Sequence, residues 1–178
     1  VALKVQSPDI VHKTEAGGVR LGVEGAAAIT EAYEAIVKST KQYAPQARIN
    51  GVLVQEMARP GVEMMLGVIR DPVFGPIVAV GLGGIFVEVL ADVSFRICPI
   101  TRLDAQEMLD DLKGAAILAG ARGRKAASRD ATIDGRLKVG GENGLLMQHA
   151  DDIAEADINP LIVSENSAVA VDARFILS

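Results

Sequence analysis

Near the end of the sequence, two apolar β-type segments flank the polar run at residues 164–167. If the two middle residues of this run form a hairpin loop, the register places Asn159 directly across from Asp172. Side chains alternate along a strand, so Asp157 and Arg174 project from the same face. Amide and carboxylate oxygens suit a hard cation such as Mg²⁺, which keeps several waters and needs few protein ligands. The pattern predicts either a Mg²⁺ site or the ordinary polar outer face of a hairpin.

A second candidate site lies near the start of the chain and suits a phosphate group. Lys4 interrupts an apolar, strand-like segment, and the following loop, residues 6–18, returns through Gly17 and Gly18 into another strand. Glycine N–H groups can approach an anion closely, and the ammonium group supplies a point charge. The loop has no Walker A sequence. The alternative is a lysine whose head group simply reaches the strand edge.

His12 and Lys13 lie within this loop. A neutral imidazole is the nitrogen nucleophile that can accept a phosphoryl group near neutral pH, and the adjacent lysine could screen the incoming charge. A solvent-exposed loop histidine is the alternative. His149 has no partner pattern, and two distant histidines with the single Cys98 do not make a zinc site.

The segment Gln55, Glu56 and Met57 ends a strand, and Glu63 follows a turn. A strand that leaves the core exposes backbone N–H and C=O groups, which can pair with the edge of an adenine. An acidic residue a few positions later can accept hydrogen bonds from ribose hydroxyls. The alternative is a charged hairpin tip.

The glycine-rich run 81–85 lacks the spacing of a dinucleotide-binding fingerprint and leads into an apolar stretch. Gly83 either lets the backbone approach a ligand or makes a tight turn. Four polar residues follow at even spacing, so an extended chain would place them on one face, where they form a further site candidate: Glu88, Asp92, Ser94 and Arg96.

Composition narrows the class of protein. The 178 residues are 49% hydrophobic and 3% aromatic, which predicts an aliphatic core. A net charge of −5 without a basic stripe argues against nucleic-acid binding. The single cysteine suits a reducing compartment, and no membrane span or signal peptide is evident, so we expect a cytoplasmic protein. The chain opens inside an apolar strand without methionine, and we expect a piece of a longer polypeptide.

The elements that must position these residues form an α+β or mixed α/β arrangement. Spacing predicts helices over residues 26–43 and 101–118, the second with a capping box from Thr101 to Asp104. Glycines between residues 132 and 148 predict irregular structure there. Segments 51–57 and 62–69 are expected to pair as a hairpin. The other expected strands, besides the terminal hairpin, are residues 1–5, 19–23, 76–81 and 86–90.

Several segments, in this order and spanning nearly the whole chain, resemble the ATP-grasp domain of the ADP-forming acyl-CoA (acetate–CoA) ligases, relatives of the succinyl-CoA synthetase β subunit. The segments that carry this resemblance are LKV (3–5), SPDIVHKTEAGGV (7–19), GVLVQ (51–55), RDPVFGP (70–76), GLGGIFVEVL (81–90), DVSFR (92–96) and DINPL (157–161).

The resemblance implies two lobes, residues 1–56 and 57–178, each with a largely antiparallel sheet and helices, with ATP or ADP between them. The first lobe would be incomplete at its start and carry the phosphate loop; the second would carry the metal hairpin, residues 156–174. Asn159 and Asp172 would ligate Mg²⁺, and Glu63 would meet the ribose. The other implied nucleotide-binding residues are Lys4, Lys13, Gly17, Gly18, Gln55, Glu56, Met57, Gly83, Glu88 and Arg96.

The resemblance also implies a reaction: acid, CoA and ATP are converted reversibly to acyl-CoA, ADP and phosphate through a phosphohistidine on a mobile segment. That segment belongs to CoA-binding and CoA-ligase partner domains, and in some members the histidine matching His12 is thought to relay the phosphoryl group. Two alternatives are a nucleotide- or acyl-CoA-sensing regulatory module of a protein acetyltransferase and a carboxylate ligase that works through an acyl phosphate. His12, Asn159 and Asp172 together favour the acyl-CoA ligase.

Overall fold

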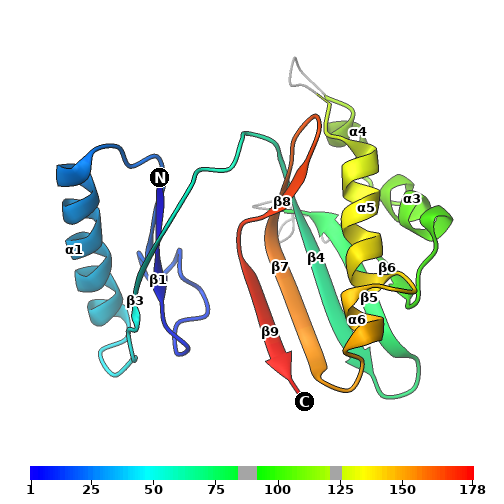
Figure 1. Ribbon diagram of the computed structural model, residues 1–178, viewed down its shortest axis with the longest axis horizontal. Helices are drawn as coiled ribbons and strands as arrows, with labels where there is room; N and C mark the ends of the chain where they lie inside the picture. The colour runs from blue at the N-terminus through cyan, green and yellow to red at the C-terminus, as the bar shows by residue number, and fades with distance from the viewer. Residues whose placement is uncertain (84–91, 121–125) are drawn as a thin grey trace. The chain divides into compact units, whose positions relative to one another are not determined.

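The chain forms two compact units, Val1–Met57 and Ala58–Ser178. A computed structural model describes residues 1–83, 92–120 and 126–178 (Figure 1). Each unit has its own cluster of buried apolar side chains, and each is therefore described by itself. The predicted strand at residues 86–90 and the candidate Glu88 lie outside the described residues.

The first unit is a three-stranded antiparallel sheet with one long helix. The strand order is β2-β1-β3, and Leu3 and Val5 on β1 pack with Ile36 of the helix in a buried cluster. The predicted helix over residues 26–43 is confirmed. The elements are β1 (Ala2–Gln6), β2 (Val19–Arg20), α1 (Ala26–Tyr43) and β3 (Gly51–Gln55).

The second unit is built on a six-stranded sheet in which all described pairs are antiparallel. Strand order is β6-β5-β4-β7-β8, and β9 also pairs with β7. The long strand β7 therefore joins the chain's last residues to the middle of the sheet. The strands are β4 (Val62–Asp71), β5 (Gly75–Leu82), β6 (Val93–Ile97), β7 (Ile153–Val163), β8 (Ala168–Ala170) and β9 (Ala173–Leu177).

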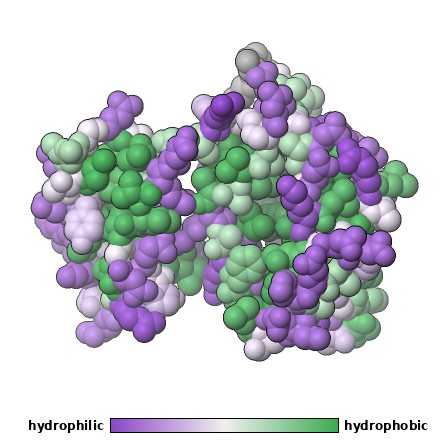
Figure 2. Space-filling model, in the orientation of Figure 1, coloured by the Kyte–Doolittle hydropathy of each residue, from purple (hydrophilic) through white to green (hydrophobic). Residues whose placement is uncertain are grey.

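Helices cover one face of this sheet (Figure 1). Alternate residues Met64, Leu66 and Val68 of β4 are buried with helical side chains, as the period of two requires. Figure 2 shows hydrophilic residues over the outer surface of these helices. Among the described residues, no helix combines the length and apolar character needed to cross a membrane. The helices are α3 (Arg102–Asp110), α4 (Ala115–Leu118), α5 (Arg129–Gly140) and α6 (Leu145–Gln148).

The opposite face of the sheet remains open within the unit. Its side chains alternate with the buried ones, and Ile69, Phe95 and Ile97 are 49%, 56% and 53% exposed. This open face carries the terminal polar residues described below.

Three sequence-based expectations are wrong. Residues 132–148 are not irregular, because α5 runs to Gly140 and its buried face includes Ile133 and Val139. Segments 51–57 and 62–69 do not form a hairpin, since β3 pairs with β1 whereas β4 pairs with β5 and β7. The single helix expected over residues 101–118 is broken, because the Asp92 carboxylate accepts hydrogen bonds from the N–H groups of Lys113 and Gly114, both at 2.8 Å.

Candidate functional site

The terminal hairpin has the predicted register. Ser164 donates its backbone N–H to the Ser167 carbonyl at 2.8 Å, and the Asn159 N–H donates to the Asp172 carbonyl at 3.2 Å. Farther along, Asp157 lies opposite Arg174 in the β7–β9 pair. The hairpin therefore brings Asn159 of β7 beside Asp172, which lies in the bend between β8 and β9.

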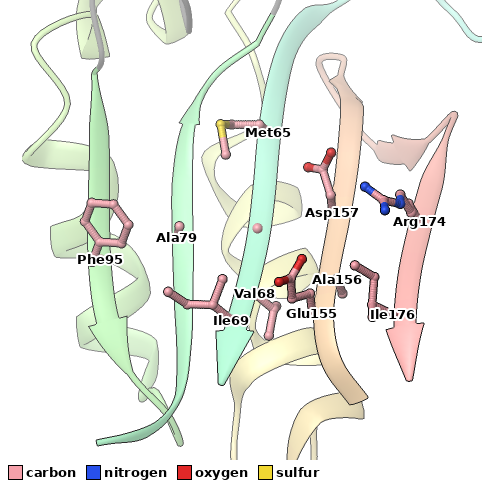
Figure 3. Close-up of a pocket in the computed structure, with 11 residues that line it drawn as sticks. Met65, Val68, Ile69, Ala79, Phe95, Glu155, Ala156, Asp157, Arg174 and Ile176 are labelled. Atoms are coloured by element: carbon pink, nitrogen blue, oxygen red, sulfur yellow. The ribbon is translucent and has the colours of Figure 1, made fainter. Parts of the chain in front are cut away.

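The pKa of Asp157 reflects desolvation of its carboxyl and the charges of two neighbouring side chains. Burial raises the pKa of the Asp157 carboxyl, and the nearby Asp172 charge raises it further, whereas Arg174 acts in the opposite direction. Figure 3 shows the Arg174 guanidinium extending from β9 toward β7, the strand that carries Asp157.

The donor chemistry of Asn159 and Asp172 fits a hard divalent cation. The described residues contain no group of three or more His, Cys, Asp or Glu side chains placed to hold a metal. A cation held by this amide and this carboxylate would therefore need further oxygen ligands from water or phosphate. That is how Mg²⁺ binds in nucleotide sites, with few protein ligands and several waters.

A groove of about 230 Å³ opens on the same sheet face (Figure 3). Gly67 and Ala79 form its floor, and they lie opposite each other in the β4–β5 register. Its other lining residues are mostly apolar, with charged groups at the β7–β9 side: Met65, Val68, Ile69, Phe95, Glu155, Ala156, Asp157, Arg174 and Ile176.

Glu63 and Gly83 are brought together at one end of the open face. The Gly83 N–H donates to the Glu63 carbonyl at 2.7 Å. A Cβ at Gly83 would stand 2.9 Å from the Glu63 carbonyl carbon, so close backbone packing requires glycine there. This contact places the Glu63 backbone and the β5 end side by side.

The phosphate-loop candidates meet within the first unit. Lys4 is buried at 7% exposure in β1, next to the loop that Gly18 closes by accepting a hydrogen bond from the Val5 N–H at 2.8 Å. A Cβ at Gly18 would lie 2.5 Å from Val5 Cγ1, and Gly17 has a φ of +64° close to Ser39. Both glycines are therefore also explained by turn geometry and packing.

His12 and Lys13 lie in the same turn. The His12 side chain is 71% exposed, and its Nδ1 is 4.0 Å from a Glu15 carboxylate oxygen. The Lys13 carbonyl accepts a hydrogen bond from the Gly18 N–H at 2.7 Å. The imidazole is accessible to a ligand, and the backbone of the turn is well ordered by internal hydrogen bonds.

The adenine candidates end the first unit. Gln55 is the last residue of β3, and its side-chain Oε1 is buried without a hydrogen-bond partner among the described residues. Glu56 is exposed, and Met57 Sδ accepts from the Gly22 N–H at 3.5 Å. These residues belong to the first unit, whereas Glu63 belongs to the second.

Arg96 does not join the other site candidates. It lies on the covered side of β6, where its guanidinium pairs with Asp111 at 2.9 Å and Glu107 at 3.6 Å. Ser94 also donates to Asp111, at 2.9 Å. The hydrogen bond with Asp111 raises the pKa of Arg96. The alternation of β6 therefore turns Ser94 and Arg96 toward α3 and away from Asp157, Asn159 and Asp172.

Of the residues that line the groove, sequence reasoning singled out Asp157 and Arg174 but not the small residues of the floor or the apolar side chains of the walls. Gly67 stands between alternating hydrophobic residues, Met65 and Ile69, which gave a strand signal and no chemical signal. A glycine in the middle of an otherwise regular strand was the available hint, because such glycines often mark the close approach of a ligand or another backbone.

Comparisons with known proteins agree with this fold. A family model described as an ATP-grasp domain matches residues 1–177. The chain is 47% identical to the acetate–CoA ligase [ADP-forming] I subunit beta of Pyrococcus furiosus, over 99% of this chain and 75% of that protein. It is 46% identical to acetate–CoA ligase [ADP-forming] I of Archaeoglobus fulgidus, over 99% of this chain and 25% of that protein.

Solved structures show the same relationship. A dinucleotide-forming acetyl-coenzyme A synthetase 1 of Ca. Korarchaeum cryptofilum, in complex with coenzyme A and Ca-AMPCP, superposes with a TM-score of 0.92 at 41% identity, over 99% of this chain and 76% of that one. Another structure of this synthetase contains Mg-AMPPCP and has its phosphohistidine segment pointing towards the nucleotide binding site; its TM-score is 0.81 at 36% identity, over 100% and 76% of the two chains.

An α+β fold with two antiparallel sheets and a polar hairpin on an open face defines a nucleotide-binding domain of the ATP-grasp class. Within that class, the chain belongs to the β-subunit-like ATP-grasp domains of the ADP-forming acetate–CoA ligases. The resemblance inferred from the sequence is thereby confirmed.

Proposed function

We propose that this domain binds Mg·ATP and supplies the nucleotide half of an acid–CoA ligase reaction. The complete reaction converts acid, CoA and ATP reversibly to acyl-CoA, ADP and phosphate. The observation that carries this proposal is the pairing of Asn159 with Asp172 on the open sheet face, in a chain whose relatives include an ADP-forming ligase β subunit.

The nucleotide would lie between the two units. Lys4 and the turn closed by Gly18 would hold phosphates, and Gln55–Met57 would meet the adenine, for which the buried, unpartnered Gln55 Oε1 offers an acceptor. Glu63 would accept hydrogen bonds from the ribose hydroxyls. Asn159 and Asp172 would hold Mg²⁺ against the phosphates, where the cation neutralises charge during transfer.

Completion of the reaction requires a partner domain of the same enzyme. An imidazole nitrogen forms a bond to the γ-phosphorus, the bond from that phosphorus to the ADP oxygen breaks, and the ring proton leaves to water. We assign the final accepting histidine to a CoA-binding or CoA-ligase partner domain, and His12 of this chain to a relay that carries the phosphoryl group to it. The chain spans about a quarter of its Archaeoglobus relative, which leaves room in such proteins for those domains.

The metal assignment is tested by replacing Asp172 with alanine. The variant should lose Mg²⁺-dependent ATP binding at least tenfold, because the carboxylate ligand is gone. Titration calorimetry with and without Mg²⁺ measures this. Asp151→Ala is the matched control, since it removes an exposed carboxylate just before β7. Wild-type affinity in Asp172→Ala would refute the metal assignment.

A second test concerns His12 as a relay. In the enzyme assembled with its partner domains, His12→Ala should slow acid-labile labelling from radiolabelled ATP by about 10²-fold or more, as removal of a nucleophile does. Mg·ATP binding should persist, since the exposed ring has few contacts. If binding is lost along with labelling, His12 is structural.

A further inference from the structure

Arg136 of α5 is a fully buried arginine that leaves one edge of its guanidinium unpaired. Nη1 donates to the Ala105 carbonyl of α3 at 2.9 Å. Nε and Nη2 have no hydrogen-bond partner among the described residues. These two nitrogens form the side-on edge of the guanidinium, where one N–H of each points in the same direction. The unpaired donors therefore make up one complete fork, which matches an anion that accepts two parallel hydrogen bonds.

The two helices around this fork supply no counter-charge among the described residues. α5 packs against α3, and the bond to Ala105 places the Arg136 guanidinium at their contact. Each acidic side chain of these helices is directed to another group. The pairs are Asp104 with Thr101, Glu107 with Arg96, Asp110 with Arg129, and both Asp130 and Asp134 with Arg102. The helices thus bury a cation and engage their own carboxylates elsewhere.

The nearby charge of Arg129 makes this burial more costly. Arg129 has the same sign as Arg136 and, after burial itself, is the second cause that lowers the pKa of Arg136. Arg129 has its own partner, because it pairs with Asp110 at 2.7 Å. A buried cation with two unpaired donors costs folding free energy, and an anion from solution would offset this cost while accepting from both donors.

We propose that the Arg136 fork binds a small monovalent anion from solution, either a halide such as chloride or a short carboxylate such as acetate. Nε–H and Nη2–H donate to the anion between α3 and α5, and Nη1 keeps its bond to Ala105. The bound anion joins two of the helices that cover the sheet. This site goes beyond the proposed function, since it takes part in no step of phosphoryl transfer.

The stability of the full chain in different salts tests this site. Urea unfolding of the unit Ala58–Ser178 is followed by circular dichroism in sodium chloride and, separately, in sodium acetate. The folded-to-unfolded ratio of the wild-type protein should rise about tenfold when the binding anion reaches about ten times its Kd. Arg136→Met lacks the fork and should not show this rise. General salt effects act on both proteins and cancel in the comparison.

Two further variants separate the fork from charge alone. Arg102→Met is the matched control, because it removes an exposed guanidinium of α3 that pairs with Asp130 and Asp134. This variant keeps the fork and should keep the full anion-dependent rise. Arg136→Lys keeps the charge without the planar pair of donors, and it should lose most of the rise. A full rise in Arg136→Lys would overturn the assignment to the fork.

Crystals of the full chain soaked in sodium bromide locate the anion directly. An anomalous-scattering peak is expected within hydrogen-bond distance of Nε and Nη2 of Arg136, and it should be absent from Arg136→Met. Bromide bound only at surface positions would overturn the site, as would wild-type and Arg136→Met proteins that respond alike to both anions. None of these results bears on the proposed function, which Mg·ATP binding decides.

Discussion

Arg136 is a buried cation on the covered side of the sheet. Its Nη1 donates to the Ala105 carbonyl at 2.9 Å, while Nε and Nη2 have no hydrogen-bond partner among the described residues. Burial and, to a smaller extent, the charge of Arg129 together lower the pKa of the Arg136 guanidinium to about 9. Such incompletely paired donors cost folding free energy.

Replacing Arg136 with methionine should therefore stabilise the protein. Exchange of buried charged groups for apolar ones of similar volume is often neutral or stabilising, by about 1–4 kcal/mol. We expect a gain within this range for Arg136→Met and none for Arg136→Lys, which keeps the charge. Urea unfolding measures both. A Met variant less stable than wild type would show that the contacts of the guanidinium stabilise the folded protein by more than its burial costs.

The same site predicts a pH dependence. The folded pKa of Arg136 is about 9, well below the ordinary value of an arginine, so the unfolded chain binds more protons above pH 9. The free-energy cost of burying the charged guanidinium is fully present below pH 9. The stability of the wild-type protein should therefore rise as the pH increases above 9. Arg136→Met should lack this rise. Comparing unfolding at about pH 7 and about pH 10 tests the difference.

For individual residues, the alternation of side chains along β-strands was sufficient to predict part of the site. It placed Asn159 across from Asp172 because both lie on one short hairpin, where a turn fixes the register. The same alternation could not assign Arg96 to a face, because α3 decides which side of β6 is covered. Gly67 escaped notice since the groove that it lines is formed with residues from strands distant in sequence.

Among the elements, α5 shows where local propensity fails. Gly135 and Gly140 disfavour a helix, yet Ser128 caps it through its hydroxyl at 3.1 Å from the Ala131 N–H, and Ile133 packs into the core. Burial of an apolar face outweighs two unfavourable residues. Similarly, the residues before β4 predict a turn, but a turn does not specify which strands pair. The partners of β3 and β4 lie in different sheets.

The two glycines of α5 should respond to alanine in opposite directions. A Cβ at Gly135 meets nothing within 4 Å, so Gly135→Ala should raise the free energy of unfolding by about 0.8–1 kcal/mol through helix propensity. A Cβ at Gly140 would stand 3.0 Å from Cys98 Sγ and 3.4 Å from Val78, both in the core. Gly140→Ala should therefore destabilise, and equal effects in chemical unfolding would contradict this packing.

At the scale of the whole molecule, the two units have separate cores of different extent. The cluster in Val1–Met57 joins one helix to a three-stranded sheet, whereas that in Ala58–Ser178 includes sheet and helices α3–α6. A domain of roughly 60 residues buries only about 60% of the surface of its unfolded chain, and its stability is marginal. The first unit is therefore expected to unfold before the second.

Mg·ATP should change this order if, as proposed, the nucleotide contacts both units. Calorimetry of the free chain should show a lower transition for the first unit, and ligand at about 100 times its Kd should stabilise the liganded form by about 2.7 kcal/mol. We expect the lower transition to move up toward the upper one. Asp172→Ala should show no such shift with Mg·ATP, although the substitution lies in the second unit. A shift confined to the upper transition would instead place the nucleotide on the second unit alone.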